Sequence, residues 1–277
     1  MRIISRSIPI PVRGILLGML LTLFGSGCEP AENHGGQPMS YWIANLTSHD
    51  STLRHRAAQA FAHDVPSSPE AIAALLQALG TEQEADVHAT LAEALSALGP
   101  DAVAAVPTLT RLLRDEHVAV RQRAAVALGT VGGGSAATVP ALVGALADPD
   151  HDVRAAAAGA LEHIGPPAAT AVGPLVTLMK NDRIGWVRLR AAAALGAIHA
   201  APGLAVPALA RQLGDDWGEM RRQALVSLAA FGPAANDVSS AIRARTRDSV
   251  SDVREAARRT ARAIQFTPPA PGQRLKQ

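Results

Sequence analysis

The sequence predicts an all-α protein, a right-handed α-α superhelix (solenoid) of about seven two-helix repeats. The first reason is that a pair of residues recurs along the chain with spacings of 34, 33, 33, 34, 33 and 33 residues. The first residue of each pair is apolar, and the second, which we call the ladder residue, is an arginine in all but one pair. The pairs are Leu53-Arg54, Val87-His88, Val120-Arg121, Val153-Arg154, Val187-Arg188, Met220-Arg221 and Val253-Arg254. The second is composition, because 48% hydrophobic but only 3% aromatic residues is typical of closely packed helices with small contact residues.

Helix start and stop signals are the third reason, and the fourth repeat illustrates them. Pro140 opens a first helix, where the missing N–H of proline costs nothing. A second helix is expected from Asp152 to His163 and ends at Gly165. Equivalent prolines lie 14 residues before the ladder residue, at Pro107, Pro174 and Pro207. Equivalent glycines lie 11 residues after it, at Gly99, Gly132 and Gly232.

The first 27 residues predict a secretory signal, since three arginines precede an apolar run over residues 14–24. That run is too short to favour a membrane-spanning anchor. The segment ending at Cys28 resembles the lipobox of bacterial lipoproteins, and the resemblance implies that Cys28 is acylated. An ordinary cleaved signal beside an unmodified cysteine is the alternative. We expect a protein of the bacterial cell envelope, lipid-anchored on the periplasmic side of the inner or outer membrane.

The remaining boundaries follow from composition. Residues 28–39 are expected to hold the lipid-anchor cysteine and a flexible tether, 40–266 the repeat array, and 267–277 a disordered tail. Without the signal's three arginines the chain carries 23 basic and 24 acidic residues, a net charge of −1. The charge is uneven, because residues 238–277 hold 9 basic and 3 acidic residues. This basic end could bind an anionic lipid surface or an acidic protein, or serve as the polar cap that a terminal repeat needs.

Five repeats have an aspartate in the turn between their helices and an arginine six positions later. The pairs are Asp115/Arg121, Asp148/Arg154, Asp182/Arg188, Asp215/Arg221 and Asp248/Arg254. The pattern resembles the HEAT-repeat family, specifically the short bacterial HEAT-like repeats also seen in bilin lyases, over about four-fifths of the chain. This resemblance implies the fold, whereas such arrays carry many unrelated activities.

These pairs predict a structural ladder. Each arginine is expected to fork between the turn carboxylate of its own repeat and that of its neighbour, fixing the angle between repeats. Repeat 1 has Ser48 in the acid position, and repeat 2 has Glu82 and His88 in place of Asp and Arg. We therefore expect the N-terminal end to be the loosest part, with His88 paired to Glu82 or to a neighbouring turn acid.

No metal, cofactor or catalytic residue is expected. Asp148-x-Asp150-x-Asp152 is like the start of a calcium-binding EF-hand loop, but Val153 and Gly159 stand where that loop needs Gly and Glu, which favours turn capping. The histidines are too widely spaced to share a metal. Nucleophile-elbow and phosphate-loop motifs are absent from the sequence. The protein is therefore predicted not to be an enzyme.

Candidate partner-binding residues fall into two groups. Arg56, Arg123 and Arg190 lie two positions after the ladder residue, on the expected concave face, about 20 Å apart. They suit an extended acidic partner, although small residues between them also fit an unliganded groove. Trp186 and Trp217 are expected in adjacent turns, either as an exposed interaction hot spot or with each ring covering the neighbouring turn.

The predicted function is a lipid-anchored, non-catalytic scaffold or adaptor that binds a protein partner in the cell envelope. One alternative is a HEAT-like bilin-lyase-type chaperone or enzyme. Another is a nucleic-acid-binding array similar to HEAT-like alkylpurine glycosylases, which requires that the signal does not function in export. Export therefore predicts no nucleic-acid partner.

Overall fold

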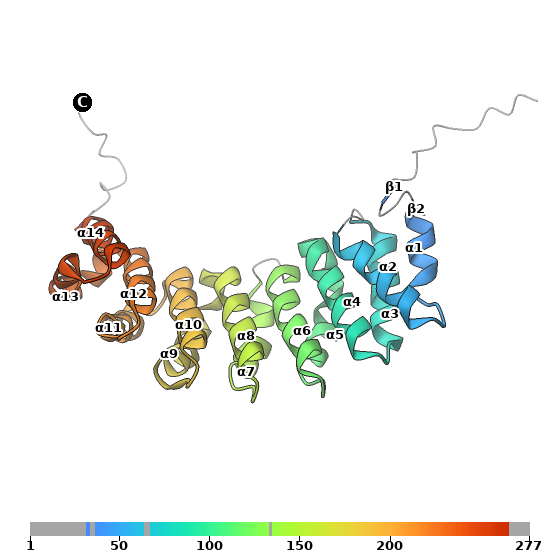
Figure 1. The fold of residues 1–277 in the computed structure, drawn as a ribbon, viewed down its shortest axis with the longest axis horizontal. Coiled ribbons are helices and arrows are strands. Elements are labelled where there is room, and N and C mark those ends of the chain that lie inside the picture. Colours follow the sequence, from blue (N-terminus) through green and yellow to red (C-terminus); the bar gives the residue numbers. More distant parts are fainter. Residues whose placement is uncertain (1–31, 34–36, 64–66, 133–134, 266–277) are drawn as a thin grey trace, which may run out of the picture. The chain divides into compact units, whose positions relative to one another are not determined.

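The computed structural model describes residues 32–33, 37–63, 67–132 and 135–265, which belong to one compact unit. The predicted signal, Cys28 and the predicted tail at 267–277 lie outside these residues. Two short antiparallel strands come first, β1 (Glu32–Asn33) and β2 (Gln37–Pro38), with Glu32 opposite Pro38 (Figure 1). They fall within the segment expected to be a tether, and the first helix begins at Met39.

The helices of the described residues pair into seven two-helix repeats, as predicted. The first helices are α1 (Met39–Asn45), α3 (Pro69–Thr81), α5 (Val106–Leu112), α7 (Val139–Ala145), α9 (Val172–Asn181), α11 (Pro202–Gln212) and α13 (Ser239–Ala244). The second helices are α2 (Ser51–His63), α4 (Ala85–Leu98), α6 (Val118–Val131), α8 (His151–Ile164), α10 (Gly185–Ile198), α12 (Gly218–Ala230) and α14 (Ser251–Gln265). Figure 1 shows the repeats following one another in chain order.

Short 3-10 helices complete the repeats. Four of them lead into a first helix: η1 (Gly99–Ala105), η2 (Ala136–Thr138), η3 (Pro166–Ala171) and η4 (Gly232–Val238). The fifth, η5 (Arg245–Arg247), follows α13. In repeat 6 the corresponding segment is α-helical, so α11 begins at Pro202 and Pro207 lies inside it rather than opening it. The expected start at Pro207 is therefore wrong by five residues.

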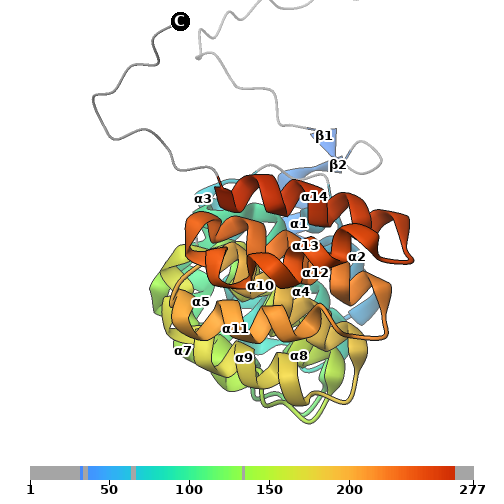
Figure 2. The same cartoon turned by 90° about the vertical axis from the view of Figure 1, so that its left-hand side faces the viewer.

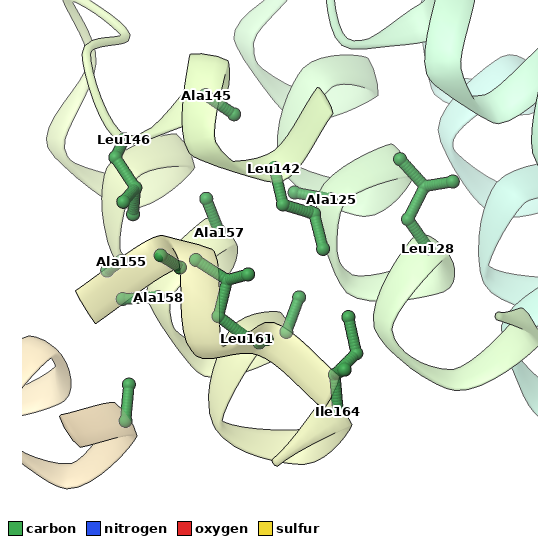
Figure 3. Close-up of a cluster of buried hydrophobic side chains, with 14 of the residues drawn as sticks. Ala125, Leu128, Leu142, Ala145, Leu146, Ala155, Ala157, Ala158, Leu161 and Ile164 are labelled. Carbon is green, nitrogen blue, oxygen red and sulfur yellow. The ribbon is translucent and has the colours of Figure 1, made fainter. Parts of the chain in front are cut away.

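The core is a continuous layer of small and branched side chains between the helices. Each second helix packs against the second helix of the next repeat, from α2 through to α14. Within repeats 3 and 4, Leu128, Leu142 and Leu161 are fully buried beside alanines such as Ala157 (Figure 3). Because every helix buries its apolar stripe against its own repeat and its neighbours, one core runs through the array.

Glycine allows two pairs of second helices to approach very closely. A Cβ added at Gly129 in α6 would lie 2.8 Å from the Cα of Ala160 in α8. One added at Gly196 in α10 would lie 2.7 Å from the Cα of Ser227 in α12. Glycine at these two positions is thus required by the small helix separation, although it favours a helix less than alanine does.

The predicted stops are observed with one exception. Gly99, Gly165 and Gly232 end their helices with positive φ angles of 63°, 69° and 51°, a conformation that suits glycine. Gly132 follows α6 with a helical φ of −64°. Repeat 5 has His199 at this position, with φ 36°, followed by Ala201 with φ 47°. His199 is left-handed with ψ 34°, whereas Gly99 and Gly165 have ψ of −142° and −138°. The chain therefore turns differently there, with residues that disfavour a positive φ.

One described segment, Ala85–Leu112, is long and apolar enough to cross a membrane by length and composition, with a mean hydropathy of 1.2. It comprises α4, η1 and α5, and the positive φ at Gly99 interrupts the helix. Because α4 packs between α2 and α6, the segment's apolar character is explained by its place in the core.

Candidate functional site

Arg121 shows how consecutive repeats are joined. Its Nε and Nη2 donate to the two carboxylate oxygens of Asp148 in the next turn, at 2.8 and 3.1 Å. Its Nη1 donates to the backbone carbonyls of Asp115 and Glu116 in its own turn, at 2.8 and 3.1 Å. We call this bidentate contact between an arginine and the carboxylate of the following repeat a rung. A planar guanidinium suits it because all three nitrogens are used at fixed angles.

Three further rungs have the same geometry. Arg54 bonds Glu82 at 2.8 and 2.9 Å, Arg154 bonds Asp182 at 2.6 and 3.2 Å, and Arg221 bonds Asp248 at 2.9 and 2.7 Å. The expectation that each arginine also contacts the carboxylate of its own turn is wrong, because the own-turn acceptors are backbone carbonyls. The carboxylate instead accepts amides of its own turn. Asp148, for example, accepts the amide of Asp150 at 2.9 Å.

The pKa values of the rung carboxylates Asp248, Asp182 and Glu82 are lowered, which favours their charged form. The Arg221 hydrogen bonds lower the pKa of Asp248 to about 2, although burial of its side chain, which is 2% exposed, opposes the shift. For Asp182 and Glu82, burial is the largest single effect and works to raise the pKa. Hydrogen bonds from Arg154 or Arg54 and from turn amides outweigh it, so both pKa values lie below their ordinary range.

The ladder weakens at two junctions. Arg188 forms an ion pair with Asp215 at 3.8 Å, which is too long for a hydrogen bond. Between repeats 2 and 3, His88 replaces the arginine, and its buried Nε2 has no hydrogen-bond partner among the described residues. A surface cavity of about 600 Å³ lies there, lined by His88, Asp115, Arg111 and others. Asp115 therefore lacks the guanidinium that its equivalents receive.

The incomplete junctions therefore do not lie at the N-terminal end of the array, where the sequence predicted the loosest part. Glu82 is occupied by Arg54, so the pairing of His88 with Glu82 is wrong. Ser48 takes the place of the first turn acid, since its Oγ accepts the amide of Asp50 at 3.2 Å. Repeats 1 and 2 are joined by a complete rung, and the incomplete junctions lie between repeats 2 and 3 and between repeats 5 and 6.

The aspartates around His151 act as turn and helix caps. Ligand atoms of Asp150, His151 and Asp152 lie within 4.8 Å of one another. However, Oδ1 of Asp150 accepts the amides of Asp152 and Val153 at 2.8 and 3.3 Å and so caps α8. This accounts for the Asp-x-Asp-x-Asp pattern without an ion.

The second helices present a common surface, which we call the second-helix face; it carries the residue two positions after each ladder residue. Arg56, Arg123 and Arg190 are exposed on it, as expected. Two of them form ion pairs with the second helix of the preceding repeat. Arg123 pairs with Glu93 at 3.7 Å, and Arg190 pairs with Glu162 at 3.5 Å. An acidic partner would have to compete with these glutamates.

A groove on the second-helix face crosses α6, α8 and α10 and has a volume of about 330 Å³. Its floor consists of small residues: Gly129, Ala155, Ala156, Gly159 and Ala160. Trp186 and Arg190 line it from α10, and Gln122 and Val126 line it from α6. The sequence carried a signal for this groove, because repeat 4 has Ala, Ala and Gly at positions where repeat 3 has Gln122, Arg123 and Val126.

The two tryptophans have different environments. Trp186 is the second residue of α10 rather than a turn residue, lines the groove, and is 38% exposed. Trp217 precedes α12 and is 41% exposed; its ring lies beside the start of α10, where a Cβ at Gly185 would be 3.6 Å from its Cζ3. The third tryptophan, Trp42, is buried in α1.

The comparisons with known proteins agree with this architecture. A search of curated protein sequences gave no match. Among solved structures, the chain is similar to the complex of CpcE and CpcF of phycocyanin lyase from Nostoc sp. PCC7120, with 25% identity, a TM-score of 0.53, and coverage of 87% of this chain and 100% of that one.

Two designed proteins show the same likeness of fold. A designed armadillo repeat protein in complex with the peptide (KR)4 has 18% identity and a TM-score of 0.52, over 82% of this chain and 99% of that one. A computationally designed armadillo repeat protein for modular peptide recognition has 20% identity and a TM-score of 0.50, with the same coverage. The family model for HEAT repeats matches residues 39–129, 82–162 and 106–196. Since these matches span more than half of the chain, the protein belongs to the HEAT-repeat family.

Proposed function

We propose that the protein is a non-catalytic HEAT-repeat scaffold that binds a protein partner through its second-helix face and is lipid-anchored in the bacterial cell envelope. The observation that carries the proposal is the groove beside Trp186. A partly exposed tryptophan above a floor of alanine and glycine offers a large apolar contact next to space for a partner's side chain. The similar designed armadillo protein in complex with a peptide supports binding by such a repeat surface.

The charges of the array support a structural rather than a catalytic use. The carboxylates with lowered pKa values each have a local cause: Arg54 and turn amides for Glu82, His117 for Asp115, Arg154 for Asp182, Arg222 for Glu219, and Arg221 for Asp248. General acid–base catalysis calls for groups whose pKa values approach the working pH, the opposite direction. The neighbours of these carboxylates therefore account for their lowered pKa values, which supports a structural role for them.

Anchoring rests on the sequence. Arg2, Arg6 and Arg13 precede the apolar run, and Cys28 follows it. Cells grown with labelled palmitate should yield labelled protein, and Cys28→Ala should abolish the label. Labelling that is absent, or that survives Cys28→Ala, would exclude acylation at this residue and leave the groove's binding role untouched.

Photocrosslinking tests the groove directly. We would place p-benzoylphenylalanine at Val126, which lines the groove and is 40% exposed, or at Val103, which is 58% exposed in η1 and serves as the matched control. In cells, the photocrosslinker at Val126 should form one discrete protein adduct that the photocrosslinker at Val103 does not form. Adding Trp186→Ala should reduce that adduct by about tenfold, the effect of losing about 1.4 kcal/mol of binding. No adduct at Val126, or the same adducts at both positions, would contradict the proposal.

A bilin-lyase-type activity is the second candidate, because the similarity to the CpcE and CpcF complex extends over 87% of this chain. The purified protein would be mixed with a bilin and its visible absorption followed. A stoichiometric spectral shift that Trp186→Ala removes would assign the groove to a chromophore. An unchanged spectrum would leave the protein-binding proposal as the better explanation.

A further inference from the structure

The ladder ends at Arg254 with half of a rung. Its Nη1 donates to the carbonyls of Asp248 and Ser249 at 2.8 and 3.0 Å, as the other ladder arginines do in their own turns. In the four complete rungs Nε and Nη2 both bond the next carboxylate, at 2.6–3.2 Å. Within the residues that the structure describes, no carboxylate bonds Nε or Nη2 of Arg254. The guanidinium is thus held by its own turn with two donors available.

Two more arginines continue the same stripe of α14. Arg258 and Arg262 follow Arg254 at intervals of four residues and therefore share one side of the helix. Both are exposed, and Figure 2 shows α13 and α14 at the end of the array, in front of the earlier repeats. We call Arg254, Arg258 and Arg262 the arginine end face.

The interior helices show what these positions normally contact. The equivalents of Arg258 and Arg262 in α10 are Ala192 and Gly196. Ala192 accepts a hydrogen bond from Ser227 of α12 at 2.7 Å, and Gly196 lies against the same residue. The arginine end face therefore occupies the surface on which an eighth repeat would stack.

Simple solubility does not require this arrangement. Like charges at intervals of four residues destabilise a helix by roughly 0.2–0.5 kcal/mol per pair, whereas a polar cap needs no net charge. Residues 239–265 hold seven arginines and three acids, and Asp248 and Glu255 are already paired, with Arg221 and Arg259 respectively. The end of the array is therefore strongly cationic and presents a preoriented carboxylate receptor.

A second copy of the chain is a poor occupant. The first repeat would have to supply the turn carboxylate, but Ser48 stands at that position and its Oγ accepts the amide of Asp50. Head-to-tail stacking would leave the Arg254 fork without its acid. An anionic lipid surface would be attracted by the positive charge, but its binding would not require the fixed orientation of the Arg254 guanidinium.

We propose that the arginine end face binds an acidic helical partner that stacks on the last repeat, placing one carboxylate in the Arg254 fork and others against Arg258 and Arg262. This surface is distinct from the groove beside Trp186, so one chain would hold two partners. The proposal stands independently of the groove's function.

The test uses a labelled helical peptide with Asp before its first turn and Glu at three positions spaced by four, and a matched peptide with Asn and Gln instead. Fluorescence anisotropy with the full chain should show binding of the acidic peptide alone. The double variant Arg258→Gln/Arg262→Gln should weaken binding by about tenfold or more, a loss of about 1.4 kcal/mol. Arg254→Lys, which keeps the charge but loses the fork, should also weaken it.

The control is Arg243→Gln/Arg247→Gln, which removes two exposed arginines from the same repeat but not from α14. It should change the affinity by less than about twofold, within the small effect expected of distant surface charge. Equal losses in both double variants would overturn the proposal in favour of diffuse charge attraction. Failure to bind the peptide, with binding to phosphatidylglycerol vesicles that depends on Arg258 and Arg262, would assign the face to a membrane instead. Thermal unfolding followed by circular dichroism checks that each variant is folded.

Discussion

At the scale of single residues, the rung carboxylates each serve two neighbours. Asp248 accepts both donors of Arg221 and also the amide of Val250 in its own turn, at 3.0 Å. The same side chain therefore shapes the turn and joins the repeats. Such a carboxylate is sensitive to acid, because protonation weakens all of these hydrogen bonds at once.

Acid titration measures this coupling. The pKa of Asp248 is about 2 when folded, against an ordinary 3.8. A depressed folded pKa means that the stabilisation is fully present above the unfolded value and is lost as pH falls through the folded one. The difference corresponds to about 2 kcal/mol. Denaturant unfolding at pH 5, 3 and 2 should show Asp248→Asn losing less stability than the wild type over this window; parallel losses would contradict the assignment.

At the scale of elements, the separation of second helices depends on which positions lack a side chain. Gly196 faces Ser227 without room for a methyl group, whereas a Cβ at Gly159 would meet nothing within 4 Å. Both glycines lie within α-helices. Helix propensity alone would favour alanine at either position. A difference between the effects of the two substitutions on stability therefore reports the packing of the helices.

Gly196→Ala should lower the free energy of unfolding by about 1–3 kcal/mol, because α10 and α12 must move apart. Gly159→Ala is the matched control and should raise it by about 0.5–1 kcal/mol, since alanine restricts the unfolded chain and fits the helix. Chemical denaturation of the two variants gives both values. A gain at Gly196 would mean that the close contact with Ser227 does not limit the helix separation.

The turn after α10 gives a second prediction at this scale. His199 has φ 36° where three other repeats have a glycine with positive φ. His199→Gly should stabilise the protein by about 1 kcal/mol, the strain of a left-handed residue with a Cβ. Gly165→Ala changes the position that corresponds to His199 in repeat 4, where φ is 69° and ψ is −138°. Because this backbone conformation is close to one that is confined to glycine, the substitution should destabilise the protein by about 1–3 kcal/mol. Thermal unfolding of both variants checks the pair, and a loss at His199→Gly would show that its bond to the carbonyl of Ala197 matters more.

At the scale of the whole molecule, the array behaves as a row of nearest neighbours, and its weakest link decides where it opens. Two junctions have no complete rung, and we predict that the weakest link is the one between repeats 2 and 3, where His88 stands beside a cavity and Asp115 lacks an arginine. Repeats 1 and 2, joined to each other by Arg54 and Glu82, should open as a pair.

His88→Arg should complete the ladder by bonding Asp115. We expect a gain of about 1–2 kcal/mol, typical of a charge-assisted bidentate hydrogen bond that is partly buried. His63→Arg, an exposed site on α2, is the control for added charge. Hydrogen exchange should show slower opening of α2 and α4 in the first variant only. Unchanged exchange there would mean that another contact limits opening.

The sequence predicted the fold because the pair of an apolar and a ladder residue recurs seven times, and the prolines, stop glycines and Asp-Arg pairs agree with that period in four or five of the repeats. It did not predict which acceptors each arginine uses, since the choice between an own-turn carboxylate and a backbone carbonyl depends on turn geometry. Trp186 was assigned to a turn because it lies next to the start of a helix; α10 begins at Gly185, which places Trp186 inside the helix and beside the groove. The groove itself arises from small residues that looked like ordinary helix formers in repeat 4.

The rungs make this chain a modular one. Every complete rung joins residues 27 or 28 positions apart, so its two halves always come from consecutive repeats. Excising or inserting one full period between Asp115 and Asp248 would therefore bring an arginine to a carboxylate at the same separation, whatever the point of the cut. A single duplication or deletion can therefore change the length of the array by a whole repeat while each ladder arginine still meets a turn carboxylate.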